Sequence, residues 1–181
     1  MDLRVETGSL MIDGNATATS WRADVIRDFA SSELFDRTFQ EGMELVEETA
    51  GYLDGGGRQE SKLLSRDAAL SYAAESMRLT TRLMQVASWL LVQRAVREGD
   101  MPPEAACEER YRMGAEDVCR SASETTEDLP AGLLILLDRS ERLYERVRHL
   151  DRRMYVEGVT PAAPHSVLAQ MHRLKSVFGQ A

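Results

Sequence analysis

The chain has 181 residues, of which 43% are hydrophobic and 29% are charged, and its formal net charge is −8. This length suits one domain with a packed core, and the acidic balance argues against nucleic-acid binding, which depends on clustered Lys and Arg. Arginines interrupt the apolar runs before they reach the roughly 18 residues of a membrane-spanning helix. With two cysteines and no secretory signal pattern at its start, the sequence predicts a cytoplasmic protein.

Residues 1–30 are mixed, with small, polar and glycine residues, so we expect a flexible, partly disordered N-terminal extension that ends in one or two helical turns. A regular pattern begins at Ser31. Ser31 or Ser32 can cap a helix there, and the glycines of the stretch DGGG (54–57) end it. Its apolar residues recur every three or four positions: Phe35, Phe39, Met43, Val46, Ala50 and Leu53.

A polar connector follows at 54–66 and is longer than most links between antiparallel helices. It is either a simple loop at the end of a bundle or a loop that binds a partner. The candidate partner-binding residues in it are Arg58, Gln59, Glu60 and Lys62.

A long helix is expected from Arg66 to Glu98, capped by Ser65 and ended by Gly99. Two adjacent apolar stripes cover more than half of its circumference, so this helix must contact neighbouring helices on two sides. One of these neighbours can come from a second subunit. The first stripe is Leu70, Ala73, Met77, Thr80, Met84, Ala87 and Leu91, and the second is Leu79, Leu83, Val86 and Leu90.

Three further residues of this helix carry predictions. Arg78 and Arg82 are expected on its remaining face, with their stems packed and their charged groups in water. Trp89 lies beside both stripes and is a possible dimer contact if it is partly exposed.

The C-terminal part is predicted to hold a short helix at about 102–113, an acidic loop (SASETTEDL), and a third main helix after Pro130 that is ended by Gly158 and the prolines beyond it. The tail then shows one more amphipathic pattern. It is either a fourth helix of the bundle or a mobile segment that folds onto a partner. Its candidate partner-binding residues are Leu168, Met171, Leu174 and Phe178.

These elements predict an all-α fold: an antiparallel three-helix bundle with a flexible N-terminal extension and a C-terminal tail. The expected divisions are an extension at 1–30, a bundle domain at 31–156, and a tail with a short amphipathic helix at 157–181.

Patterns that carry chemistry are sparse. Gly55–Gly57 follow a helix and lack the Gly-Lys-Ser/Thr of a phosphate loop, and the histidines and cysteines do not have the spacing of a metal site. We therefore expect no catalytic, cofactor-binding or metal-binding residues. Small helical bundles also include histidine phosphotransfer proteins, so His149 is an alternative functional residue, although the Leu-Asp-Arg-Arg that follows it departs from their pattern.

A long stretch, residues 41–106, reads EGMELVEETAGYLDGGGRQESKLLSRDAALSYAAESMRLTTRLMQVASWLLVQRAVREGDMPPEAA. A second stretch, residues 164–178, reads PHSVLAQMHRLKSVF. Together they resemble the regulator of CtrA degradation (RcdA) family of alphaproteobacteria. The resemblance covers residues 31–156 well and does not extend to residues 1–28.

The resemblance implies a homodimeric three-helix bundle without enzymatic activity, which acts as an adaptor for the ClpXP protease. It implies that the ClpX unfoldase, primed by the response regulator CpdR, is a partner. It also implies the cyclic-di-GMP effector PopA and cargo proteins such as CtrA as partners, engagement of the primed protease by the tail, and recruitment to the cell pole. A structural dimer unrelated to proteolysis is the remaining alternative.

Overall fold

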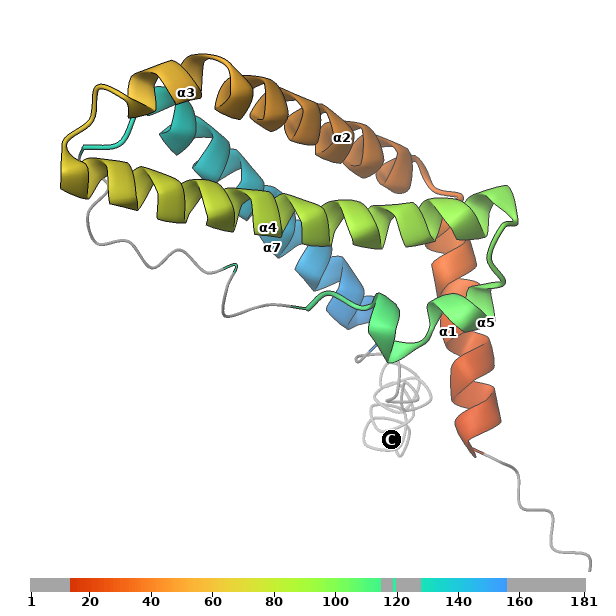
Figure 1. The fold of residues 1–181 in the computed structure, drawn as a ribbon. Coiled ribbons are helices and arrows are strands. Elements are labelled where there is room, and N and C mark those ends of the chain that lie inside the picture. Colours follow the sequence, from red (N-terminus) through yellow and green to blue (C-terminus); the bar gives the residue numbers. More distant parts are fainter. Residues whose placement is uncertain (1–13, 115–118, 120–127, 156–181) are drawn as a thin grey trace, which may run out of the picture.

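The computed structural model describes residues 14–114, 119 and 128–155, and every regular element in these ranges is helical (Figure 1). The predicted all-α class is confirmed. The elements in chain order are α1 (Gly14–Ala30), α2 (Glu33–Asp54), α3 (Gly56–Ser61), α4 (Arg66–Glu98), α5 (Pro103–Ala106), the 3-10 helix η1 (Glu109–Tyr111) and α7 (Ala131–Tyr155).

Local capping sets the ends of α2 and α4. The Phe35 amide donates to Ser32 Oγ at 3.2 Å, and the Ala68 amide donates to Ser65 Oγ at 3.3 Å, so each serine satisfies a free amide of a first turn. Gly99 ends α4 with φ of 82°, a left-handed conformation that favours glycine. These helix boundaries agree with the predicted ones.

Two predicted segments differ from the structure. The connector at 54–66 contains the short helix α3, which packs against α2. The helix expected at 102–113 is only Pro103–Ala106 followed by the 3-10 turn, because Glu108 is extended. The Tyr155 hydroxyl donates to the Ala106 carbonyl at 2.7 Å, so α7 stabilises the end of this short helix.

The three long helices α2, α4 and α7 lie against one another (Figure 1). Helix α2 is antiparallel to α4, but α4 and α7 run in the same direction. Arg82 contacts the early part of α7 at Leu137, and Trp89, two turns later in α4, contacts Asp151 near its end. The prediction of an antiparallel bundle is therefore wrong for this pair. The long segment between α4 and α7 permits a parallel order, whereas a short link would force an antiparallel one.

Helix α1 crosses the end of the bundle near α5 and belongs to its core (Figure 1). Ile26 and Ala30 are fully buried, and the Phe29 ring lies 5.6 Å from Trp89 and 5.8 Å from Phe35, centroid to centroid. The bundle therefore begins before residue 31, where the sequence placed its boundary. Apolar burial against α4 and α5 is the physical reason.

Candidate functional site: an uncharged face on helix α4

The outer face of α4 carries large apolar side chains where a solvated helix normally carries charges. Between Asp67 and Arg94 the only charged residues are Glu75, Arg78 and Arg82. Glu75 and Arg82 are buried, and Arg78 is partly buried against the Glu75 carboxylate. The side chains facing solvent are instead Leu70 (64% exposed), Met77 (72%), Met84 (64%) and Leu91 (50%). Depletion of charge and enrichment of Met are typical of the centre of protein interfaces.

These four residues recur every seven positions, and smaller residues follow each of the first three. A repeat of seven keeps one seam of a helix facing one partner helix. We call this surface the α4 face, and define it as Leu70, Ala73, Met77, Thr80, Met84, Ala87 and Leu91. The sequence predicts this stripe and a neighbouring helix packed against it. In the structure the other stripe, which includes Leu79 and Leu90, is the one in the core.

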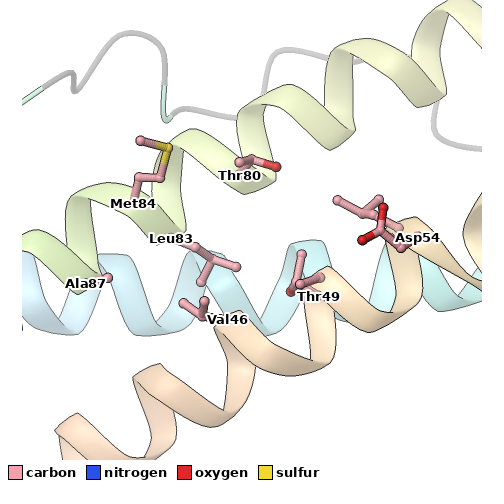
Figure 2. Close-up of a pocket in the computed structure, with 9 residues that line it drawn as sticks. Val46, Thr49, Asp54, Thr80, Leu83, Met84 and Ala87 are labelled. Carbon is pink, nitrogen blue, oxygen red and sulfur yellow. The ribbon is translucent and has the colours of Figure 1, made fainter.

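A groove runs beside the α4 face, between α4 and α2 (Figure 2). Its volume is about 300 Å³ and its lining is mainly apolar. Thr80, Met84 and Ala87 belong both to this groove and to the α4 face. A second, shallower hollow of about 290 Å³ lies over Ser76, Met77, Thr80 and Thr81. The α4 face therefore borders one groove and includes part of a shallow hollow. The groove is lined by Val46, Thr49, Ala50, Leu53, Asp54, Thr80, Leu83, Met84 and Ala87.

Arg82 is a charged residue on the side of α4 that faces the core, and hydrogen bonds satisfy its charge there. Its guanidinium is fully buried and donates to the Cys119 carbonyl from Nε at 3.1 Å and from Nη2 at 2.7 Å. Nη1 donates to Ser140 Oγ at 2.8 Å and to the Leu137 carbonyl at 3.3 Å. The prediction that its charged group lies in water is therefore wrong. The fixed fork of an arginine can satisfy several buried acceptors at once.

A family model described as "Protein of unknown function (DUF1465)" matches residues 26–178. The crystal structure of RcdA from Caulobacter crescentus CB15 is 72% identical in sequence, with a TM-score of 0.60, over 72% of this chain and 98% of that chain. This chain belongs to the RcdA family. Among curated proteins none matches it. The predicted resemblance to the RcdA family is confirmed.

Trp89, the predicted dimer contact, lies in the core of this RcdA-family chain. Its side chain is 2% exposed, and Nε1 donates to Asp151 Oδ1 at 3.0 Å. The same carboxylate accepts from Arg112 Nη2 at 3.3 Å and from the Met113 amide at 3.4 Å. The condition for a dimer contact, partial exposure, is not met. The position of Asp151 in α7 could not be read from the sequence around Trp89.

The structure brings the four candidate loop residues together on and next to α3, and all four are exposed. Lys62 Nζ donates to Gln59 Oε1 at 3.2 Å, and Glu60 Oε2 accepts from the Tyr52 hydroxyl at 2.7 Å. Burial, and then the Glu60 carboxylate, raise the pKa of the Tyr52 phenol above its ordinary value. Glu60 therefore has a structural partner, while Arg58 extends from the same short helix into solvent.

The tail candidates Leu168, Met171, Leu174 and Phe178 lie outside the described residues. His149 is exposed on α7. Cys107 and Cys119 are free thiols, and burial raises the pKa of both above the ordinary value, which makes them poor nucleophiles at neutral pH. Within the described ranges, no three His, Cys, Asp or Glu side chains are placed to hold a metal ion, and no helix is long and apolar enough to cross a membrane.

Proposed function

We propose that this protein is a non-enzymatic adaptor that delivers cell-cycle regulators to the CpdR-primed ClpXP protease for degradation. The observation that carries the proposal is the 72% identity with RcdA over nearly the whole of that chain. The proposed partners are ClpX with CpdR, the cyclic-di-GMP effector PopA, and cargo proteins such as CtrA. The proposed state is a cytoplasmic homodimer that is recruited to the cell pole.

The mechanism is tethering. An adaptor that holds cargo and protease together raises the concentration of cargo near the unfoldase, without any new chemical step. The α4 face and the neighbouring groove support this mechanism, because they give the chain an exposed apolar surface of the kind that binds proteins. The lining of the groove is mainly apolar and carries no Lys or Arg, which favours protein partners over nucleic acid.

A purified degradation assay tests the adaptor function. Cargo loss is measured with ClpXP, CpdR, PopA and cyclic-di-GMP, in the presence and absence of this protein. We expect faster loss of CtrA when the protein is added. Identical rates with and without it would contradict the proposal.

A tail variant tests how the protease is engaged. The double substitution Leu168→Asp with Met171→Asp is expected to slow delivery while leaving the melting temperature nearly unchanged. Ile135→Asp, at an exposed apolar position of α7, is the matched control and should deliver cargo normally. If the double variant instead unfolds the bundle, the tail is a fourth core helix.

A further inference from the structure

The groove between α2 and α4 leaves apolar side chains facing water (Figure 2). Met84 is 64% exposed, and Val46 and Leu53 on the opposite wall are only partly buried. The wall formed by α2 runs from Val46 to Asp54, which is about 12 Å of helix. A groove of this kind fits the apolar side of one short amphipathic helix.

The tail of the same chain contains a segment with the pattern of such a helix. Its apolar residues recur every three or four positions, so they would form one side of a helix of about 20 Å. An isolated helix of this length is marginal in water, and it therefore needs a surface on which to fold. The apolar residues are Val167, Leu168, Met171, Leu174 and Phe178.

The groove and the tail also differ in charge. Helix α2 carries seven acidic residues and one arginine. Among the described residues, neither Glu47 nor Asp54 on the groove side of α2 forms an ion pair. Residues 158–181 include Arg173 and Lys175 but no Asp or Glu. The basic tail therefore complements the acidic edge of the groove.

The end of α7 lies within reach of the groove. Asp151, near that end, accepts from Trp89, which is level with Ala87 at one end of the groove. The ten residues 156–165 span up to about 33 Å when extended. The path around α4, a helix about 10–12 Å across, is about 20 Å long. The tail would thus enter the groove at Ala87 and run toward Asp54.

We propose that residues 166–178 dock as a helix into the α2–α4 groove of their own copy, antiparallel to α4. Leu168 and Met171 then lie against Met84, and Lys175 lies beside Asp54. Because the tail is tethered close to the groove, a weak contact is enough to hold it there. A partner that binds the tail uncovers the groove, and a partner that binds the groove releases the tail. This coupling within one copy goes beyond the adaptor proposal.

Amide hydrogen exchange of the full chain tests the docking. Amides of residues 166–178 should exchange at least about tenfold more slowly in the unchanged protein than in Met84→Asp, because the carboxylate disrupts the apolar contact. Leu70→Asp is the matched control, since Leu70 is also 64% exposed on α4 but does not line the groove. It should keep the slow exchange. Equal exchange in the unchanged protein and in Met84→Asp, whether fast or slow, would overturn the proposal.

A zero-length crosslink tests which residues meet. The chain has only two lysines, Lys62 and Lys175, so a carbodiimide, which joins an amine to a carboxylate as an amide, has few possible products. We expect a link from Lys175 to Asp54 that is lost in Asp54→Asn. Asp67→Asn, at an exposed position of α4, is the control and should keep the link. A chain in which Lys175 does not join Asp54 would contradict the proposed register.

Isotope labelling tests whether the tail docks in its own copy. Chains grown with nitrogen-14 and nitrogen-15 are mixed before crosslinking, and the linked peptides are identified by mass. Links between Lys175 and Asp54 of one isotope support the proposal, whereas links of mixed isotope would assign the groove to the tail of another copy and overturn it. These measurements need only the purified chain, so their failure would leave the adaptor proposal to the assay with ClpXP and CpdR.

Discussion

At the scale of single residues, Arg82 connects three parts of the chain. Its guanidinium joins α4 to the Cys119 carbonyl and to two groups of α7, Leu137 and Ser140. A buried charge is costly unless it is hydrogen-bonded, and here all three nitrogens of the guanidinium donate. These hydrogen bonds offset the cost of burying the charge, and those to Leu137 and Ser140 hold α7 against the inner side of α4. That arrangement leaves the apolar α4 face outside.

Arg82→Ala is expected to lower the free energy of unfolding by about 3–5 kcal/mol, because it removes four hydrogen bonds, takes both arginine donors from the Cys119 carbonyl and opens a cavity. Urea unfolding followed by circular dichroism measures the change as a shift in midpoint. Arg66→Ala, at an exposed position of the same helix, is the control and should change stability by no more than about 0.5 kcal/mol. Equal midpoints for the two variants would show that the buried arginine contributes no stability.

At the scale of helices, α2, α3 and α7 meet around the side chain of Tyr52 at one end of the bundle. The Tyr52 ring of α2 lies between Gly57 of α3 and Gly132 of α7. A Cβ added at Gly132 would lie 2.6 Å from Tyr52 Cε2, and one at Gly57 would lie 2.6 Å from Tyr52 Cε1. Such distances are too short for unbonded carbons, so these two glycines are required by packing. Gly51, one position before Tyr52, has nothing within 4 Å of an added Cβ.

Substitution by alanine should change the stability of the protein in opposite directions at a glycine packed against the Tyr52 ring and at a glycine with no neighbour. Gly132→Ala is expected to destabilise the protein by about 1–3 kcal/mol, since the tyrosine ring must move. Gly51→Ala is expected to stabilise it by up to about 1 kcal/mol, since alanine favours a helix interior and meets no neighbour. Thermal unfolding of the two variants beside the unchanged protein gives both signs. Destabilisation by Gly51→Ala would show that α2 needs glycine there for another reason.

At the scale of the whole molecule, local signals predicted the helices and long-range contacts decided the rest. Ser32, Ser65 and Gly99 act within one turn of their own helices, so the sequence alone located those ends. The direction of α7 depends on pairs such as Arg82 with Ser140, which lie far apart in the chain. Likewise, the periodicity of α4 reveals two apolar stripes but not which one is buried. Residues on α2 and α7 make that choice, and the candidate site follows from it.

The place of α1 in the molecule gives the last prediction. The sequence assigned residues 1–30 to an extension, whereas α1 supplies the fully buried Ile26 to the core. Ile26→Ala is therefore expected to lower the free energy of unfolding by about 2–5 kcal/mol, as for other buried aliphatic truncations. Trp21→Ala, on the same helix but 42% exposed, is the control and should cost less despite removing a larger side chain. Denaturant unfolding measures both. If Ile26→Ala has no effect, α1 is separable from the bundle, and the domain begins at residue 31 after all.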